Sequence, residues 1–397
     1  MLTLDKIYHA AFVLKEAIRQ TDMIPSHNIR SDVDLYLKTE NLQVTGSFKV
    51  RGAYYKISQL SDEEKKRGVI ACSAGNHAQG VALAATKNGI KSLICLPDVA
   101  PISKIEATKR LGAEICLVKG VYDDAYNKAL ELQKEHGYTF IHPFDDYDVI
   151  AGQGTIGLEI LDQLPDVDAV VVPIGGGGLI SGVAYAVKSL KPECKVYGVQ
   201  ASGAPSMLNS VHDHKIERLD SVSTIADGIA VKEPGSHTFE CCSKYVDGIV
   251  SVTDDEISAA ILALIEQHKL VTEGAGAVGV AAVMFGKLPV EGKKVCCLLS
   301  GGNIDVNILS RVIERGLLMS GRSALITVEL LDKPGQLRDV SAIIAEQGGN
   351  VVSVHYERAN EGSDINGCFL RIQIETRNHD HIVKIRKALA DKGFKLV

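Results

Sequence analysis

The sequence of 397 residues is poor in three features, and each absence excludes a class of protein. No stretch approaches about 18 uninterrupted apolar residues, so no membrane-spanning helix is expected. No long basic run occurs and the net charge is -6, which argues against nucleic acid or an anionic membrane as a partner. The nine cysteines include no CxxC pair. Buried, reduced thiols in the cytosol are therefore favoured over disulfides or a zinc site.

The first twenty residues also lack the pattern of a signal peptide, because Asp5, Glu16 and two lysines interrupt the apolar positions. They predict an amphipathic helix instead, and a cytoplasmic protein is expected. Hydrophobic residues make up 46% and charged residues 23%, which is normal for a globular protein. The length exceeds that of one ordinary core and suggests two or three domains.

Strand-like and helix-like segments alternate through the middle of the chain. Short apolar runs such as GVIACS and SLICLP are each followed by a helical period. This alternation favours an α/β fold in which helices cover both faces of a parallel sheet. Thr253 and Glu256 form a capping box that predicts a helix through Glu266. The predicted strands span residues 68–73, 92–97, 113–120, 168–174, 195–200, 248–252 and 294–300.

The pattern changes after about Ser323. The residues that follow predict the order βαββαβ, with the loop NEGSDIN (360–366) between the second and third strands. This order predicts a small ferredoxin-like domain over residues 324–397. The preceding segment 316–323 is short and rich in small residues, as linkers often are.

Three glycine-bearing segments are candidate anion sites. Gly152–Gly157 fits G-x-G-x-x-G, but no clear strand precedes it, so a dinucleotide site is disfavoured there. The tetraglycine run 175–178 follows an apolar strand and leads into a helix. Its backbone N–H groups could hold a phosphate, although the run could equally be a flexible loop. Ser73–His77 has the same strand-to-helix setting and could hold a carboxylate; His77 alone would more often be structural.

Lys49 lies in NLQVTGSFKVRGA (41–53), where a helix is expected to begin. A desolvated lysine near a phosphate cradle is a candidate Schiff-base residue. Pyridoxal phosphate needs a lysine for its aldehyde, a cradle for its phosphate and a partner for its ring nitrogen. Ser300 ends a predicted strand, where an open sheet delivers side chains into its crevice.

Four motifs together resemble the fold-type II pyridoxal-phosphate enzymes, and among them the threonine dehydratase (threonine ammonia-lyase) family. They are SFKVRGA (47–53), SAGNHAQG (73–80), the tetraglycine and SGGN (300–303). The resemblance covers residues 1–318. It implies a tryptophan synthase β-like catalytic domain of two open parallel-sheet subdomains, with the smaller, about 50–145, inserted in the larger. Residues 324–397, with DKPG at 332–335, resemble an ACT regulatory domain.

The resemblance implies a role for each matching residue. Lys49 would join pyridoxal 5′-phosphate as a Schiff base and act as the catalytic base, and Phe48 would pack beside the ring. The substrate carboxylate would be bound by Ser73, Ala74, Gly75, Asn76 and His77. The other implied cofactor contacts are Asn76 at the 3′-oxygen, Gly175, Gly176, Gly177 and Gly178 at the phosphate, Ser300 at the pyridine nitrogen, and Gly228 and Glu273 near the ring.

Two positions depart from the related serine racemases. Those enzymes carry a second serine as a base on the opposite face, where this chain has Ala74. Alanine cannot deliver a proton, so dehydration is expected rather than racemisation. The racemases also hold a divalent cation with carboxylates, and the matching positions here are Gln200, Ala204 and Ser206. No metal is expected there, nor at the HxH spacings of residues 212–214 and 379–381.

The family implies conversion of L-threonine to 2-oxobutanoate and ammonia, and of L-serine to pyruvate. The alternatives are a serine racemase or a dehydratase of another β-hydroxy amino acid, and a dinucleotide-binding or ligand-sensing protein. An ACT-like domain implies a homodimer or homotetramer with a small allosteric effector. The effector would be isoleucine with valine, as in isoleucine biosynthesis, or a nucleotide such as AMP or ADP. The sequence does not distinguish between these effectors.

Overall fold

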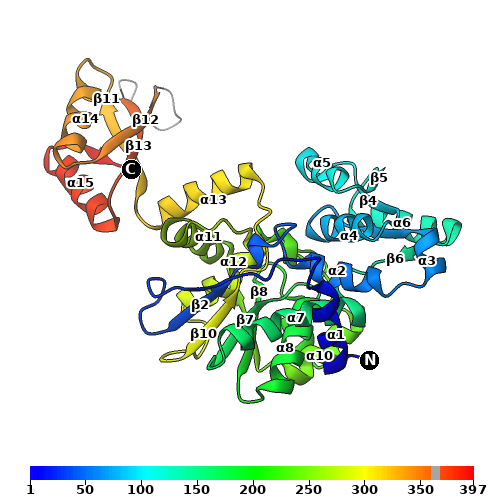
Figure 1. Ribbon diagram of the computed structural model, residues 1–397. Helices are drawn as coiled ribbons and strands as arrows, with labels where there is room; N and C mark the ends of the chain where they lie inside the picture. The colour runs from blue at the N-terminus through cyan, green and yellow to red at the C-terminus, as the bar shows by residue number, and fades with distance from the viewer. Residues whose placement is uncertain (359–366) are drawn as a thin grey trace. The chain divides into compact units, whose positions relative to one another are not determined.

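The computed structural model describes residues 1–358 and 367–397, and the predicted loop 360–366 lies outside the described residues. The chain forms two compact units, Met1–Asp305 and Val306–Val397 (Figure 1). Within the described residues, no helix is long and apolar enough to cross a membrane. The helices of the first unit are α1 (Leu4–Leu14), α2 (Lys49–Ser58), α3 (Asp62–Arg67), α4 (Asn76–Lys87), α5 (Ile102–Arg110), α6 (Tyr122–His136), α7 (Tyr147–Gln163), α8 (Gly178–Leu190), α9 (Ser206–His212), α10 (Ser236–Tyr245), α11 (Asp254–Ala263) and α12 (Gly274–Met284), with the short turns η1 (Glu40–Leu42), η2 (Asp227–Ile229) and η3 (Leu264–His268).

The larger sheet of the first unit has the strand order β1-β2-β10-β7-β8-β9. All neighbours pair in parallel except β1, which is antiparallel to β2. Alternate side chains divide the two faces: Val170 and Val172 pack into a core with α7 and α8, whereas Val171 faces Gly279 of α12. The strands are β1 (Met23–Pro25), β2 (Asp34–Lys38), β7 (Ala169–Pro173), β8 (Lys195–Ala201), β9 (Gly248–Val252) and β10 (Lys294–Leu298).

The smaller sheet is fully parallel, with the order β5-β4-β3-β6. Residues of α2, α4 and α5 form a core on one face, and residues of α6 form a core on the other. Figure 1 shows these helices around the sheet at the right of the view. The predicted α/β class with two parallel-sheet subdomains is therefore confirmed. The strands are β3 (Val69–Cys72), β4 (Ser92–Pro97), β5 (Glu114–Val118) and β6 (Thr139–Phe140).

The G-x-G-x-x-G segment lies inside α7 and not in a phosphate loop, so the dinucleotide alternative is wrong. Each of its glycines lets another helix approach closely. A Cβ atom on Gly152 would lie 2.7 Å from the Arg51 carbonyl oxygen, and one on Gly154 would lie 3.0 Å from the Gly182 carbonyl oxygen. The spacing that mimics a fingerprint therefore serves the packing of α7 against α2 and α8.

A buried ion-pair network holds α2 against α7 and the larger sheet. Arg51, two residues after Lys49, is fully buried and donates to both carboxylate oxygens of Glu40 at 2.8 Å. It also donates to Glu159, at 2.6 and 3.0 Å. Lys38 of β2 donates to the same Glu159. Because every charge in this network has a partner, burial of the Arg51 guanidinium is compatible with a stable fold.

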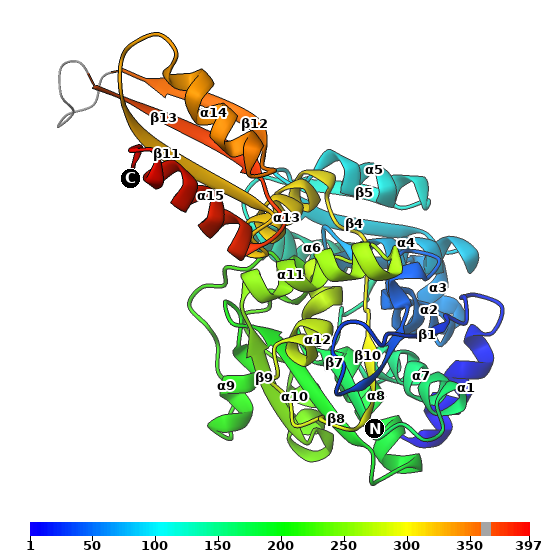
Figure 2. The same cartoon turned by 90° about the vertical axis from the view of Figure 1, so that its left-hand side faces the viewer.

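The described residues of the second unit form a four-stranded antiparallel sheet and three helices, and their order confirms the predicted βαββαβ pattern. Strand order is β12-β13-β11-β14, and the buried side chains of β11 alternate along the strand. Figure 2 shows α14 and α15 beside the sheet, and their apolar residues share one core with it. The elements are α13 (Val306–Met319), β11 (Ser323–Leu331), α14 (Gln336–Glu346), β12 (Asn350–Glu357), β13 (Gly367–Glu375), α15 (His379–Asp391) and β14 (Lys395–Leu396).

Candidate active site

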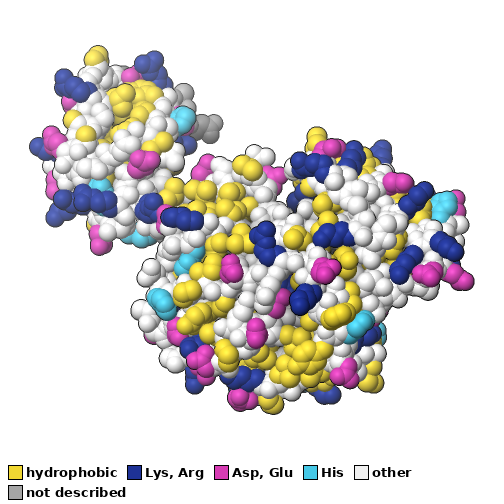
Figure 3. Space-filling model, in the orientation of Figure 1, with side chains coloured by type: hydrophobic (Ala, Val, Ile, Leu, Met, Phe, Trp, Pro, Cys, Tyr) yellow, Lys and Arg dark blue, Asp and Glu magenta, His cyan; other side chains and the backbone are white. Residues whose placement is uncertain are grey.

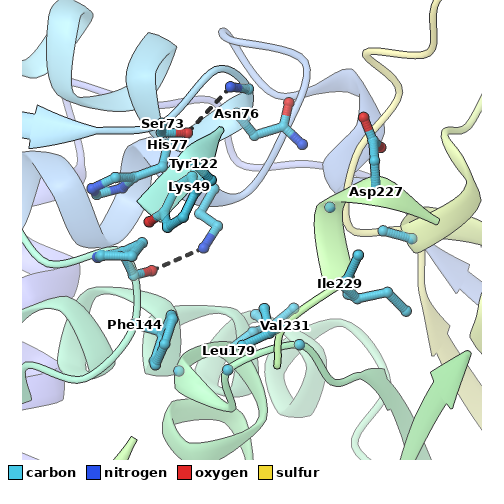
Figure 4. Close-up of a pocket in the computed structure, with 18 of the residues that line it drawn as sticks. Lys49, Ser73, Asn76, His77, Tyr122, Phe144, Leu179, Asp227, Ile229 and Val231 are labelled. Atoms are coloured by element: carbon cyan, nitrogen blue, oxygen red, sulfur yellow. Dashed lines mark hydrogen bonds between the residues drawn. The ribbon is translucent and has the colours of Figure 1, made fainter. Parts of the chain in front are cut away.

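A cavity of about 830 Å³ lies in the first unit, where the carboxyl ends of strands in both sheets meet (Figure 4). Its wall brings together segments that are far apart in the sequence. The predicted site residues Phe48, Lys49, Ser73, Ala74, Gly75, Asn76, His77, Gly175, Gly176, Gly177, Gly178, Gly228, Glu273 and Ser300 all line it.

Lys49 is the first residue of α2 and points into the cavity. Its Nζ atom donates a hydrogen bond to the Pro143 carbonyl oxygen at 2.8 Å and lies 5.3 Å from the centre of the Phe48 ring. Burial lowers the pKa of Lys49 to about 8, although the charge of Glu273 opposes this shift. About a tenth of the amine is therefore unprotonated and nucleophilic at pH 7, far more than for an ordinary lysine.

The lysine motif and the SGGN motif are joined by a short antiparallel bridge. Ser47 pairs with Gly301, and the Phe48 N–H donates to the Ser300 carbonyl oxygen at 3.1 Å. Gly46, at φ +69°, turns the chain so that its carbonyl accepts from the Gly302 N–H. This pairing fixes the start of α2 and places the Ser300 hydroxyl and the Lys49 amine on the same cavity.

Three polar side chains form a hydrogen-bonded row beside the lysine. The Asn303 amide donates to Asn76 Oδ1 at 2.8 Å, and the Asn76 amide donates to Glu273 Oε1 at 2.7 Å. Burial, together with Asp227, raises the pKa of Glu273 to about 7. Asn76 is thereby held in one orientation at the cavity wall, as a contact to a cofactor oxygen requires. Sequence reasoning identified Asn76 and Glu273 but gave Asn303 no role of its own.

The segment between β3 and α4 presents backbone N–H groups at a helix N-terminus. Ser73 Oγ accepts from the Gly75 N–H at 3.2 Å, which shapes the turn. The His77 ring is directed into the protein, where Nε2 pairs with the Ile141 carbonyl oxygen at 2.8 Å. Burial lowers the pKa of His77 to about 3. The imidazole is therefore neutral and serves the packing of the protein. Only the main chain of His77 is part of the loop that faces the cavity.

The tetraglycine forms a cradle that side chains would fill. A Cβ atom on Gly176 would lie 2.5 Å from the Phe144 ring, and one on Gly178 would lie 2.8 Å from the Phe144 main chain. Gly177, at φ +97°, precedes the first turn of α8. The Thr238 hydroxyl donates to the Gly176 carbonyl oxygen at 2.6 Å and holds the loop. Free N–H groups at this helix start fit the phosphate of pyridoxal phosphate.

Ser300 and Gly228 complete the wall where a cofactor ring would lie. Ser300 follows β10, and its hydroxyl lies 3.4 Å from the Ala275 carbonyl oxygen. A Cβ atom on Gly228, in η2, would lie 3.2 Å from Glu273 Oε1. Lysine, phosphate cradle and hydroxyl are thus present around one cavity. These are the three groups that pyridoxal phosphate requires.

The segment His142–Asp145 is a part of the site that sequence reasoning missed. It follows β6, which has only two residues and therefore gives no periodic signal. Pro143 accepts from Lys49, and Phe144 packs on the glycine loop. The Asp145 carboxylate accepts from the main-chain N–H groups of residues 236, 237 and 238 and caps α10. The segment therefore connects the lysine, the cradle and the helix that supports the cradle.

The positions compared with the racemase cation site are occupied by neutral side chains. Gln200 Oε1 accepts from the Leu208 N–H at 2.8 Å, and the Ser206 hydroxyl donates to the Val231 carbonyl oxygen at 2.8 Å. Across residues 1–358 and 367–397, no group of three or more histidine, cysteine or acidic side chains is arranged to hold a metal ion. All nine cysteines are free thiols.

Comparison with known proteins defines the class first. Residues 14–301 match the family of pyridoxal-phosphate dependent enzymes, and this range contains Lys49, the tetraglycine and Ser300. Pyridoxal phosphate is therefore the cofactor of the enzyme class to which this site belongs.

Individual relatives identify the family within this class of pyridoxal-phosphate-dependent enzymes. An L-threonine ammonia-lyase of Thermotoga maritima is 52% identical, and the match covers 100% of this chain and 99% of the relative. A catabolic L-threonine dehydratase of Staphylococcus aureus is 46% identical over 81% of this chain and 95% of its own. The chain belongs to the threonine ammonia-lyases, a lyase family of pyridoxal-phosphate-dependent enzymes.

Solved structures share the fold of most of this chain. The processed threonine deaminase isoform 2 of Solanum lycopersicum has a TM-score of 0.75 and 39% identity, covering 80% of this chain and 90% of that chain. A maize serine racemase also has a TM-score of 0.75, with 35% identity over 80% of this chain and 98% of that chain. The same scaffold therefore occurs with two different named activities.

Proposed function

We propose that the chain dehydrates and deaminates L-threonine to 2-oxobutanoate and ammonia, with pyridoxal phosphate joined to Lys49. The observation that carries this proposal is one amine with a pKa lowered to about 8, which shares a cavity with a glycine cradle and a strand-end hydroxyl. The names of the full-length relative from Thermotoga maritima and of the Staphylococcus aureus dehydratase support the substrate.

Each part of a bound amino acid has a complementary group in the cavity. The N–H groups of residues 73–77 hold the substrate carboxylate at the start of α4. The bound cofactor supplies an electron sink that makes the Cα proton acidic. Lys49 would be the base that takes that proton, and its lowered pKa would keep it competent near neutral pH. Asn76 would hydrogen-bond the 3′-oxygen of the cofactor, Glu273 would lie near its ring, and Gly175–Gly178 would hold its phosphate.

The partner of the cofactor ring nitrogen favours elimination over transamination. Ser300 is neutral and buried. A hydroxyl group cannot stabilise a full positive charge on the ring nitrogen as a carboxylate would, so the bound ring would draw less negative charge away from Cα and more would be available to expel the β-oxygen. This property of Ser300 supports the proposal that the enzyme catalyses elimination, as a lyase does.

Replacement of Lys49 by alanine tests the proposal. The wild-type protein should be yellow, should release 2-oxobutanoate from L-threonine, and should retain the cofactor covalently on Lys49 after borohydride reduction. The Lys49→Ala variant should lose the reducible bond and nearly all activity. A variant that releases ammonia from threonine at the wild-type rate would contradict the proposal.

Serine racemisation is the second candidate, because a serine racemase has the same fold at equal TM-score. Ala74 lines the cavity, and its methyl group cannot protonate the opposite face of a substrate. We therefore infer that L-serine is converted to pyruvate and not to D-serine. Chiral analysis of serine after incubation tests this inference, and D-serine formation at a rate comparable to that of pyruvate would refute it.

We further propose that residues 1–318 are catalytic and that residues 324–397 regulate them as an ACT-like domain within a homodimer or homotetramer. Exposed apolar side chains on β11 and on the edge strand β12 support an interface between copies. They are Leu325 and Leu331 on β11, and Val352, Val354 and Tyr356 on β12. The register places Val354 and Tyr356 on the face of the buried Ile372 and Leu370, and Leu325 on the opposite face. Figure 3 shows hydrophobic side chains gathered over these strands. Threonine kinetics with isoleucine, valine, AMP and ADP added in turn would identify the effector, and unchanged kinetics with all four would contradict regulation by these ligands.

A further inference from the structure

His142 is held in one tautomer by the turn that follows it. Its Nδ1 atom accepts hydrogen bonds from the main-chain N–H groups of Phe144, at 3.2 Å, and Asp145, at 2.8 Å. Both partners are donors, so Nδ1 carries no hydrogen atom. The ring hydrogen of the neutral imidazole is therefore on Nε2.

The His142 ring is only partly buried and lines the cavity beside Lys49. Burial lowers the pKa of His142, the positive charge of Lys49 lowers it further, and Asp145 and Asp146 oppose the shift. The ring is thus a neutral donor near pH 7. Among the residues that the structure describes, Nε2 has no hydrogen-bond partner.

Two other polar side chains on this wall already have partners. The Tyr122 hydroxyl donates to the Cys72 carbonyl oxygen at 3.5 Å, and Lys104 pairs with Asp227 at 2.7 Å. Ser73 Oγ accepts from the Gly75 N–H and keeps its own hydroxyl proton, but this residue belongs to the loop proposed to bind the substrate carboxylate. His142 therefore provides a fixed donor that no neighbour uses, next to the amine that must reach the substrate Cα.

Two of the three polar groups of a β-hydroxy amino acid already have partners in the proposed function. The amino group joins the cofactor and the carboxylate lies at the start of α4, so the β-hydroxyl remains. We propose that His142 donates its Nε2–H to the β-hydroxyl of the bound substrate and so stabilises negative charge on the departing oxygen. This inference rests on the proposed function and assigns His142 a contact to the reacting group.

Two substitutions separate the roles of the two ring nitrogens. In His142→Asn, the side-chain oxygen can accept from the same two N–H groups as an Asx turn, but no donor reaches the cavity. In His142→Gln, the longer amide can place a donor near the position of Nε2, but the turn loses its acceptor. The first variant thus removes the proposed function of His142 and keeps its structural contact, and the second does the reverse.

The test compares two substrates in the holoenzyme: L-threonine, whose leaving group is hydroxide, and β-chloro-L-alanine, whose chloride leaves without a donor. For His142→Asn, kcat/KM on threonine should fall by roughly 100-fold, which is typical for loss of one donor to a developing oxyanion. On β-chloro-L-alanine, kcat/KM should change by less than roughly threefold. The thermal midpoint and the cofactor affinity should stay close to wild type.

His142→Gln should show the opposite balance, with a lower thermal midpoint and more threonine activity than His142→Asn. Equal losses on both substrates, or no loss on threonine, would overturn the inference while leaving the proposed function intact. A wild-type protein that binds the cofactor but releases no 2-oxo acid from threonine or serine would refute the proposed function, and the inference with it.

Discussion

At the scale of one residue, burial changes the proton affinity of the Glu273 carboxyl group. It lies in the cavity wall, 2.7 Å from the Asn76 amide nitrogen, and only 5% of its surface is exposed. Asn76 and the positive charge of Lys49 favour the carboxylate, whereas burial and Asp227 favour the protonated acid more strongly. The result is a group that changes its charge close to neutral pH.

The Glu273→Gln substitution should show how the raised pKa of Glu273 affects the free energy of unfolding. A carboxyl group whose pKa rises from 4.5 to about 7 on folding stabilises the fold fully below pH 4.5, and this contribution is lost as the pH rises through 7. Relative to the cofactor-free wild type, Glu273→Gln should therefore gain about 3 kcal/mol between pH 4.5 and pH 8. Urea unfolding at several pH values measures this gain, and a difference that does not depend on pH would contradict it.

At the scale of elements, helices, strands and loops of the first unit approach one another closely at glycines, and Gly176 of the cradle is one of these positions. A Cβ atom on Gly176 would lie 2.5 Å from three atoms of the Phe144 ring, so the ring or the loop would have to move. The same loop is anchored by Thr238 at the start of α10. A change at Gly176 therefore disturbs the cradle between β7 and α8.

Gly176→Ala should weaken binding of pyridoxal phosphate by roughly 10- to 100-fold, the range expected for an overpacked site. Gly279→Ala in α12 is the matched control, because its Cβ atom would have neighbours no closer than 3.4 Å. Absorbance titration with the cofactor measures both affinities. Equal affinities for the two variants would show that the glycine loop does not hold the phosphate.

The network around Arg51 predicts a large loss of stability. Arg51→Met leaves Glu40 buried without its bidentate partner, which should cost about 3–5 kcal/mol. Lys109→Met is the control: it removes an exposed pair with Glu106 and should cost less than about 1 kcal/mol. Denaturant unfolding of both variants decides the comparison, and similar midpoints would contradict the proposed importance of the network.

Strong local signals made several elements predictable. The six-residue, mostly apolar strand β4 and the capping box of Thr253 lie where the sequence predicts them. The N-terminal strand β2 was missed because its charged residue Lys38 is buried, and only its tertiary partner Glu159 makes that possible. The glycines of α7 could be interpreted either as a phosphate-binding loop or as helix contacts. Both need residues without a side chain, so the sequence pattern alone could not distinguish them.

The site was predictable where motifs are contiguous and was missed where tertiary contacts create it. Lys49, Asn76, the tetraglycine and Ser300 carry recognisable local patterns. His142 and Asp145 have no such pattern, and their importance follows from contacts with the glycine loop, Lys49 and α10. Strand β6, which positions them, pairs through only two residues and gives no hydrophobic period.

At the scale of the whole molecule, the described residues form two units, and the apolar clusters of the two units are separate. One core contains only residues of the second unit, from Ala324 to Leu389 among its buried members, and the other cores lie entirely in the first unit. The Staphylococcus aureus dehydratase matches only 81% of this chain while using 95% of its own. The first unit therefore has what an independent domain needs.

A chain that ends at Leu318, the end of the proposed catalytic part, should fold and deaminate threonine with a kcat within roughly threefold of the full-length value. It should also lose any response to the effector that acts on the full chain. Thermal unfolding and steady-state kinetics of the two proteins provide the comparison. An unfolded or inactive truncated chain would show that the second unit supports the catalytic fold.

The bridge between Ser47 and Gly301 has a consequence for biosynthesis. Residues 34–38 pair in parallel with residues 294–298, so a segment near the start of the first unit contacts a segment near its end. A growing polypeptide on the ribosome exposes Lys49 long before β10 and Ser300 exist, and contacts so distant in sequence form slowly. Vitamin B6 capture therefore waits for the last strand of the sheet, and a nascent or truncated fragment that lacks it offers an ordinary lysine.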